Sequence, residues 1–377
     1  MTNAYIIGAS RTAVVPRSGA FAQHAVYDLG ACVIRSALGN SGISARNVDH
    51  VVMGNALYGG GNPTRLAALA AGLPESVPAF TIDTQCCSGL DAINLACSMV
   101  SAGTAKVVIA GGLESYSRSP LRQHRPKDKS EKPIDYARPA FTPWPQRDPD
   151  MLESASELAQ QRNVTRQQQE EFAILSHAKA SQASPGETEI TDIAGIERDA
   201  FTRKLSRAVC SRAAVVCGDA VTGLTTTTVA VEADAAAAVV VISETMLAKL
   251  SDRVRPIKVL SHCSVGSDPS VPSIAPIAAV DRVLRLQGVS ATHLRVAEVM
   301  EAFAVQAMVC INECEFASTI VNRGGGALAR GHPIGASGAV LAVRLWNELQ
   351  KEACGSLGLA TIAAAGGLGS ATLWRVT

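Results

Sequence analysis

Residues 81–90 read Thr-Ile-Asp-Thr-Gln-Cys-Cys-Ser-Gly-Leu and place a cysteine directly before an apolar helical pattern. Leu90 and Ile93 begin an apolar face at helical spacing, and Gly103 is a typical stop signal after that pattern. We predict that Cys86 lies in the first turn, where the positive end of the helix dipole favours the thiolate. Cys86 is therefore a candidate nucleophile, with a buried structural cysteine as the alternative.

A histidine in a glycine-rich loop near the C-terminus is the second feature that indicates chemistry. Residues 331–338 read Gly-His-Pro-Ile-Gly-Ala-Ser-Gly and follow the string Asn-Arg-Gly-Gly-Gly at 322–326. Glycines allow close approach of the backbone to a ligand and let His332 project from a tight turn before the helical run 339–349. A lone histidine is more often structural. A cysteine with a distant histidine, however, is the arrangement of thiol acyl chemistry, in which the histidine is a base or an oxyanion donor.

The two motifs together resemble those of the thiolase family, and further strings extend this resemblance over almost the whole chain. In order, they are IIGASRT at 6–12, VMGN at 52–55, NPTR at 62–65, GGLES at 111–115, EAFA at 301–304 and GGLG at 366–369. The resemblance implies an α/β protein with the thiolase fold, in which two similar αβαβα-layered halves bring their active-site loops together. A weak internal repeat agrees with two halves, because AGGLES at 110–115 is echoed by AGGLGS at 365–370.

The character of the sequence changes between residues 118 and 225. Segment 124–133 is charged and proline-punctuated, and two helical patterns follow at 151–162 and 165–182, the second with a capping signal at Thr165. This region resembles the loop domain that covers coenzyme A in thiolases. The predicted divisions are an N-terminal half made of residues 1–117 and 226–254, a loop domain of residues 118–225, and a C-terminal half of residues 255–377.

Composition excludes several other classes of protein. The 377 residues are 47% hydrophobic and 18% charged, and the net charge of +1 gives no sign of nucleic-acid binding. No apolar run reaches the length of a membrane span, and the first residues lack the pattern of a secretory signal, so we expect a cytoplasmic protein. The ten cysteines are irregularly spaced, which favours reduced thiols over a disulfide framework or a metal site.

The resemblance also implies roles for particular residues. Cys86 would be the acyl-accepting nucleophile and His332 its catalytic partner, while the backbone N–H groups of Cys86 and Ala365 would form an oxyanion hole. Positions expected to contact substrate or coenzyme A are Ser261, Ala302 and Phe303. No metal or separate cofactor is implied, because the coenzyme A ester is itself the substrate.

Two positions depart from the family pattern. Met300 stands where thiolases usually have an asparagine that holds a catalytic water, and methionine cannot orient that water. Ala363 stands where the family has a second cysteine that acts as acid and base, and alanine has no proton to give. Both losses fall on the step that makes or receives an acetyl-CoA enolate, whereas the acyl-loading groups remain.

The sequence therefore predicts a thiolase-family acyltransferase in which Cys86 accepts an acyl group from an acyl-CoA or related thioester. The acceptor would need little help with deprotonation, or could be water, and a malonyl-type donor that loses CO₂ would also bypass the missing base. Two alternatives stay open: an ordinary acetyl-CoA C-acyltransferase with a replacement acid, and a non-catalytic protein that binds acyl-CoA or scaffolds a partner. The resemblance implies a homo-oligomer, either a dimer or a tetramer, with no nucleic-acid or membrane partner.

Overall fold

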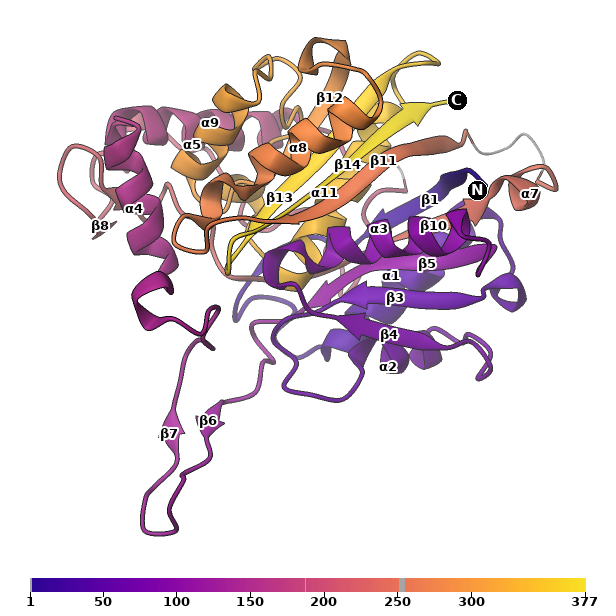
Figure 1. Ribbon diagram of the computed structural model, residues 1–377, viewed down its shortest axis with the longest axis horizontal. Helices are drawn as coiled ribbons and strands as arrows, with labels where there is room; N and C mark the ends of the chain where they lie inside the picture. The colour runs from indigo at the N-terminus through magenta and orange to yellow at the C-terminus, as the bar shows by residue number, and fades with distance from the viewer. Residues whose placement is uncertain (1, 187, 251–254) are drawn as a thin grey trace.

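The computed structural model describes residues 2–186, 188–250 and 255–377, which build a central sheet of ten strands (Figure 1). In the N-terminal half the strands run, in spatial order, as β1 (Ala4–Arg11), β10 (Ala233–Ser243), β5 (Val107–Glu114), β3 (His50–Gly54) and β4 (Ala79–Ile82), with β2 (Val15–Pro16) paired to β10. Strand β10 is antiparallel to both neighbours, whereas β3, β4 and β5 are parallel. All eight residues of β5 and all eleven of β10 are buried, as expected for strands covered on both faces.

The C-terminal half repeats this plan on the other side of β1. Its strands, in spatial order from β1, are β11 (Ile257–Gly266), β14 (Leu368–Val376), β13 (Leu357–Ala364) and β12 (Leu294–Val299). Within the sheet, the two halves meet where β1 pairs antiparallel with β11, with Tyr5 opposite Lys258 and Ile6 opposite Ile257. This arrangement of one mixed sheet in two similar portions agrees with the two halves expected from the sequence.

Helices form three layers around the two half-sheets. The buried helices α3 (Ser88–Ser101) and α11 (Ile334–Leu349) contact each other and strands of both halves, and they share one apolar core with them. The outer face of the N-terminal half is covered by α1 (Val26–Ser41) and α2 (Pro63–Ala70), and that of the C-terminal half by α8 (Ala275–Leu286). The sequence of layers is therefore helix, sheet, helix, sheet, helix, which confirms the predicted fold class.

Glycines let the central helices approach their neighbours closely. A Cβ on Gly89 of α3 would lie 2.7 Å from the backbone nitrogen of Ala339 in α11, and one on Gly338 would lie 2.6 Å from that of Leu90. A Cβ on Gly112 of β5 would overlap the carbonyl oxygen of Gly335. Gly335 and Gly338, which read as a loop signal in the sequence, therefore lie in a closely packed helix, and α11 begins at Ile334 rather than near residue 339.

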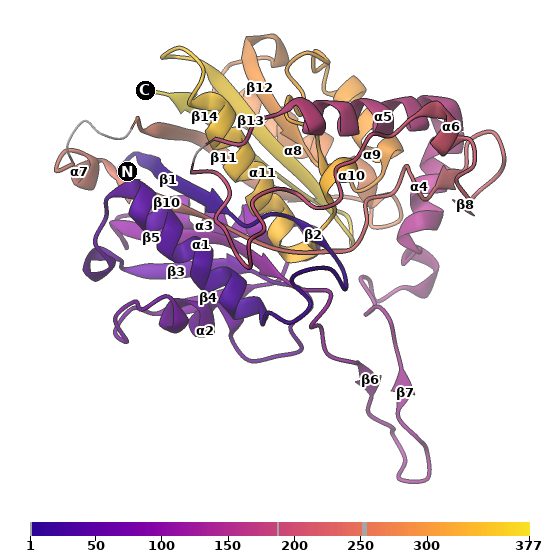
Figure 2. The same ribbon diagram turned by 180° about the vertical axis from the view of Figure 1, so that it is seen from behind.

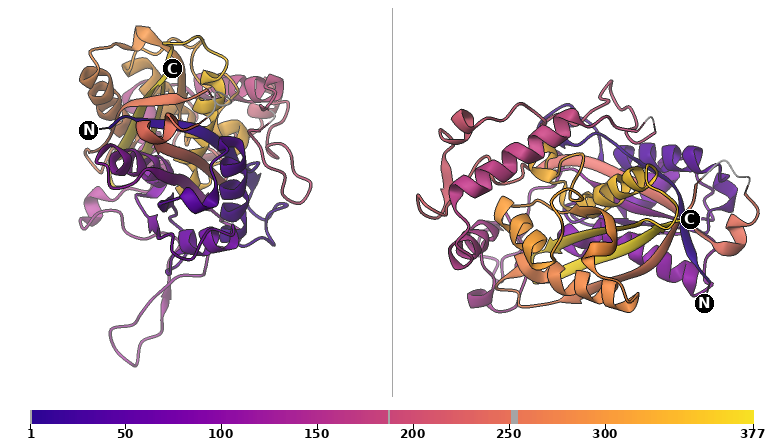
Figure 3. Two further views of the ribbon diagram at one scale, coloured as in Figure 1. Left: turned by 90° about the vertical axis from the view of Figure 1, so that its right-hand side faces the viewer. Right: turned by 90° about the horizontal axis from the view of Figure 1, so that it is seen from above.

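The helices and strands of the predicted loop domain gather at the end of the molecule away from both termini (Figure 3), whereas Ile190, Ile193 and Ile196 pack against the core of the N-terminal half. Its elements are the hairpin of β6 (Gln123–His124) and β7 (Ile134–Asp135), the helices α4 (Met151–Gln161), α5 (Arg166–Gln182) and α6 (Arg207–Cys210), and the strands β8 (Val215–Cys217) and β9 (Leu224–Thr225). Thr165 and Gln168 form the capping box of α5 that the sequence predicts. The β6–β7 hairpin extends far from the other elements (Figures 1 and 2).

Of the remaining helices, α9 (Ala304–Glu313) and α10 (Ala327–Arg330) contact α5 at this end of the molecule. Helix α7 (Glu244–Leu247) follows β10 and lies at the opposite end, near the N-terminus (Figure 1). The predicted boundary at residue 254 lies outside the described residues. Within the described part of the chain, every helix is too short or too polar to cross a lipid bilayer.

Candidate active site

Cys86 lies in a single 3-10 turn, Gln85–Cys87, that leads directly into α3. Gln85 adopts a left-handed conformation with φ of 55°, which is uncommon for a residue with a side chain. Ser88 fixes the turn from both sides, because its hydroxyl donates to the Gln85 carbonyl at 2.6 Å and accepts from the Thr84 N–H at 2.8 Å. This turn holds Cys86 at the start of α3, where it lines a pocket. The neighbouring Cys87 is fully buried in the core.

His332 reaches the Cys86 thiol from the opposite half of the chain. Gly331, with φ of 119°, makes the turn before it, and the His332 N–H donates to the Val231 carbonyl at 2.8 Å. The His332 Nε2 lies 3.1 Å from the Cys86 Sγ, and Nδ1 lies 2.6 Å from the Ser337 hydroxyl. In the tautomer in which Nδ1 donates to the Ser337 hydroxyl, Nε2 is free to accept a proton from the thiol.

Burial decides the protonation state of this pair. It raises the pKa of the Cys86 thiol to about 12, although the backbone N–H groups of Cys86 and Ala365 act in the opposite direction. Burial likewise lowers the pKa of His332 to about 4. At neutral pH the resting pair is a neutral thiol beside a neutral imidazole. Desolvation thus acts against the thiolate that the place of Cys86 at the start of the helix is expected to favour.

The pair faces a largely apolar pocket of about 210 Å³. Ala302 and Phe303, both expected from the sequence to contact substrate, line it, and Phe141 and Met151 of the loop domain close it from the other side. Ala363, Ala364 and Ala365, at the end of β13 and the start of the following turn, form a further wall. A larger hollow of about 570 Å³ near the base of the β6–β7 hairpin includes neither Cys86 nor His332 in its lining.

The structure does not bring every predicted residue to this pocket. Met300 is 1% exposed and packs in the central core, so its side chain does not line the pocket. Ser261 is also buried, and its hydroxyl donates to the Val283 carbonyl of α8 at 2.9 Å. Ser261 is therefore directed toward the outer helix of its half and not toward Cys86.

Glu114, at the end of β5, is a site residue that the sequence reasoning did not single out. Its carboxylate accepts hydrogen bonds from the Asn55 side chain at 2.8 Å and from the N–H groups of Ala56 and Gly335 at 2.9 Å. Burial raises its pKa to about 7, against the lowering effect of these N–H groups. Since Gly335 is three residues after His332, Glu114 ties the histidine loop to the strand end beside Cys86. Its place in the GGLES string is the only signal that could have indicated it.

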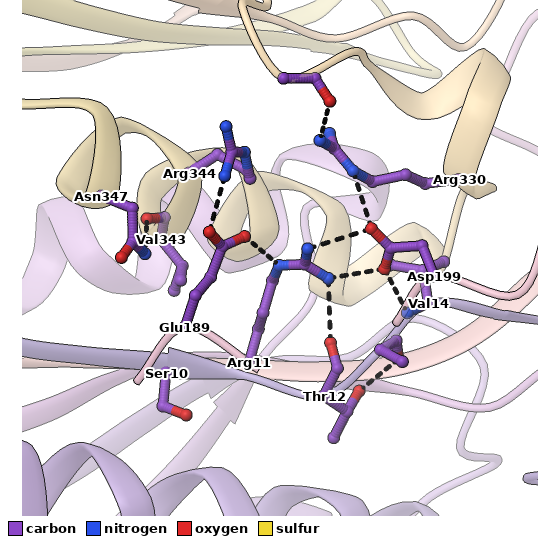
Figure 4. Close-up of polar contacts among 12 residues, drawn as sticks. Ser10, Arg11, Thr12, Val14, Glu189, Asp199, Arg330, Val343, Arg344 and Asn347 are labelled. Atoms are coloured by element: carbon purple, nitrogen blue, oxygen red, sulfur yellow. Dashed lines mark hydrogen bonds and ion pairs between the residues drawn. The ribbon is translucent and has the colours of Figure 1, made fainter. Parts of the chain in front are cut away.

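A buried ion network lies next to the loop that carries His332 (Figure 4). Arg11 of β1 pairs with Glu189 at 2.9 Å and with Asp199 at 2.7 Å, and Asp199 also accepts from Arg330 of α10. Arg330 precedes His332 by two residues and donates to the carbonyls of the glycine string at 324–326. These charges tie β1, the segment after α5 and the histidine loop together.

Two family models match the chain, one for the thiolase N-terminal domain over residues 4–245 and one for the thiolase C-terminal domain over residues 254–376. The "Putative acetyl-CoA C-acetyltransferase YhfS" of Bacillus subtilis is 36% identical over 381 residues, with 99% of each chain covered. The "Putative acetyl-CoA C-acetyltransferase VraB" of Staphylococcus aureus strain MRSA252 is 35% identical, with 87% of each chain covered. A "Probable acetyl-CoA acyltransferase" of Staphylococcus aureus strain COL is 32% identical, with 97% of each covered.

Proposed function

The chain belongs to the thiolase family, and on that premise we propose that Cys86 accepts an acyl group from an acyl-CoA or related thioester and passes it to an acceptor. The observation that carries this proposal is the 3.1 Å contact between the Cys86 Sγ and the His332 Nε2 at the wall of an apolar pocket. A nucleophile and its base within hydrogen-bond reach are the usual signature of covalent acyl catalysis.

In the loading step, the Cys86 sulfur attacks the thioester carbonyl carbon while the His332 Nε2 takes the thiol proton. The carbonyl oxygen becomes an oxyanion, for which the backbone N–H groups of Cys86 and Ala365 are the available donors. Both N–H groups lower the pKa of the Cys86 thiol, as hydrogen-bond donors to a sulfur anion do. The tetrahedral state collapses with cleavage of the bond to the coenzyme A sulfur, which leaves with the proton from His332. The neutral resting pair suits this concerted route, because no isolated charge is buried before substrate arrives.

The enolate half-reaction has less support from the chain's own groups. Ala363 lines the pocket at the position of the family's second cysteine and has no proton to transfer, and Met300 is directed into the core. A general acid or base contributes typically about 10²–10⁴-fold to a rate. We therefore propose that acyl loading is efficient and that carbon–carbon bond formation or cleavage is impaired, with transfer to a readily ionised acceptor or to water as the main outcome.

A second candidate is an ordinary acetyl-CoA C-acetyltransferase in which another group replaces the missing acid. The names of the YhfS and VraB proteins favour it, since they describe that activity for relatives that match most of this chain. In both cases the coenzyme A ester is itself the acyl donor, and no separate cofactor is proposed.

We further propose that the protein is a cytoplasmic homo-oligomer. Strand β4 forms one end of the sheet, and Phe80 on it is 37% exposed. The adjacent helix α2 carries Leu66 and Leu69, which are 40% and 41% exposed. An apolar sheet edge of this kind is a usual site of subunit contact.

The decisive test is intact-protein mass spectrometry after mixing the protein with a panel of acyl-CoA and 3-ketoacyl-CoA esters. We expect an acyl mass increment on the wild type that peptide mapping assigns to Cys86 and that Cys86→Ala lacks. Cys354→Ala is the matched control, because Cys354 is an exposed cysteine that could exchange acyl groups without catalysis. Absence of any increment on Cys86 with every ester would contradict the proposal and favour a binding role.

A further inference from the structure

The pocket beside Cys86 offers few side chains that could donate a hydrogen bond to a substrate carbonyl. Of its polar lining residues, the Gln85 Nε2 donates to the Asp83 carboxylate at 3.2 Å, and the Gln306 Nε2 donates to the Cys310 Sγ at 3.8 Å. Both amides are thus engaged with neighbouring protein groups. Beyond the catalytic pair, the remaining polar side chains of the lining are the hydroxyls of Tyr116 and Ser273.

Tyr116 is held in place by its neighbours on both sides. Before it, Glu114 is fixed by three hydrogen bonds to the elements around the histidine loop. On either side of it, the Ser115 hydroxyl and the Ser117 N–H donate to Asp234 of β10, at 3.2 Å and 3.0 Å. A short segment anchored at both ends presents the phenol ring at a defined place in the pocket wall, as a preorganised donor requires.

The Tyr116 hydroxyl is free to meet a substrate. No hydrogen bond joins it to a described residue, and Tyr116 lines the same pocket as Cys86 and His332. Burial, followed by Cys86, raises the pKa of Tyr116 far above its usual value. The phenol therefore stays neutral throughout the physiological range, and can donate a hydrogen bond but is a poor source of phenolate.

We propose that the Tyr116 hydroxyl donates a hydrogen bond to the thioester carbonyl oxygen of the acetyl-CoA enolate, in place of the water-binding group lost at Met300. This proposal rests on the acyl transfer proposed above and deepens it: Tyr116 would stabilise the enolate oxygen, while the enolate step stays slow because Ala363 supplies no acid or base. When Cys86 attacks the ketone of a 3-ketoacyl-CoA, the new S–C bond forms and the C2–C3 bond breaks. Its electron pair passes into the enolate, whose oxygen Tyr116 stabilises. The proton taken from the Cys86 thiol finally reaches C2, so no further reactant is needed and the phenol keeps its own proton.

The experiment compares two donors that load the same acyl group on Cys86. Acetyl-CoA acetylates the thiol without any enolate, whereas acetoacetyl-CoA acetylates it only by releasing one; butyryl-CoA and 3-ketohexanoyl-CoA form a second such pair. Single-turnover acylation is followed by quenching and intact-protein mass spectrometry. We expect Tyr116→Phe to slow acylation from the ketoacyl donors by about 10²-fold, the usual effect of one oxyanion donor, with acylation from the simple esters changed less than about twofold.

Ser273→Ala is the matched control, because it removes the other hydroxyl of the pocket. We expect it to leave the ratio of the ketoacyl-donor rate to the simple-ester rate near that of the wild type, whatever its effect on substrate binding. Equal losses with both donors in Tyr116→Phe, no loss with either, or a selective loss in Ser273→Ala instead would overturn the assignment to Tyr116. A wild type that is acylated by simple esters and never by ketoacyl donors would overturn it as well. If no donor acylates the wild type, the acyl-transfer proposal itself fails, and the two failures are thereby distinguished.

Discussion

At the scale of single residues, the site depends on the thiol proton of Cys86, which faces the neutral imidazole of His332. Burial holds the pKa of Cys86 near 12 and that of His332 near 4, so the thiol keeps its proton until a substrate carbonyl is in reach. The direction of the His332 ring then matters more than its basicity. Ser337 holds that direction through its 2.6 Å contact with Nδ1.

Removal of the Ser337 hydroxyl should therefore slow the loading step without affecting the fold. We expect Ser337→Ala to reduce the single-turnover rate of Cys86 acylation by roughly tenfold, because one hydrogen bond contributes about 1–1.5 kcal/mol. Ser337→Thr, which keeps a hydroxyl, should recover part of the rate. Ser98→Ala is the control, since the Ser98 hydroxyl only donates to a carbonyl within α3. An unchanged rate in Ser337→Ala would show that the histidine needs no such partner.

The sequence predicted the residues that carry the chemistry better than it predicted their surroundings. Cys86 and His332 stand in strings that are informative by themselves, and the structure brings them together over 246 positions. The roles of Ser337, Glu114 and Tyr116 depend on their distance from His332 and the pocket, which only the folded chain defines. The sequence also could not predict the protonation state of Cys86 and His332, because it depends on how far the pocket excludes water.

At the scale of elements, the contact of α11 with α3 and β5 fixes the distance between the two catalytic loops. The sequence predicted the helices at 151–162 and 165–182, which correspond to α4 and α5, and α5 begins at the expected cap, Thr165. It missed the first turn of α11, because Gly335 and Gly338 have low helix propensity. Their value lies in the close approach that they allow, which no local pattern reveals.

This packing leads to a pair of glycine substitutions with opposite effects. A Cβ at Gly112 would overlap the backbone of Gly335, so Gly112→Ala should force the sheet and α11 apart and cost about 1–3 kcal/mol of stability. Gly39 lies on the exposed side of α1, where an added Cβ would have no neighbouring atom within 4 Å. There, alanine should stabilise the helix by up to about 1 kcal/mol. Urea unfolding followed by circular dichroism measures both, and a stable Gly112→Ala variant would contradict the close contact.

At the scale of the whole molecule, buried charges join segments that are far apart in the chain. Arg11 is 1% exposed and lies in the first strand, while Asp199 belongs to the segment that returns from α5, and Arg330 precedes the catalytic histidine. The sequence alone does not indicate that these residues form ion pairs, because they lie far apart in the chain and no common motif contains them. Removing one partner of such a cluster is costly because it leaves the others buried without compensation.

The cluster predicts how stability depends on pH. Burial would raise the pKa of Asp199, but Arg11 and Arg330 outweigh it and lower that pKa from 3.8 to about 2. A carboxylate with a lowered pKa stabilises the fold above pH 4 and loses this contribution as the pH falls toward 2. The whole contribution is about 2 kcal/mol, of which roughly half is lost by pH 3.

Asp199→Asn removes the titrating group and should destabilise the protein by about 3–5 kcal/mol at pH 5. Because the wild type alone loses the contribution of Asp199 on acidification, the difference in unfolding free energy between the two proteins should narrow by about 1 kcal/mol at pH 3. Urea unfolding at both pH values measures this. Asp281→Asn is the control, since Asp281 pairs with Arg285 on the surface, with side chains 65% and 73% exposed, and should leave the pH dependence unchanged. A difference that stays constant between pH 5 and pH 3 would mean that the arginines do not hold Asp199 ionised.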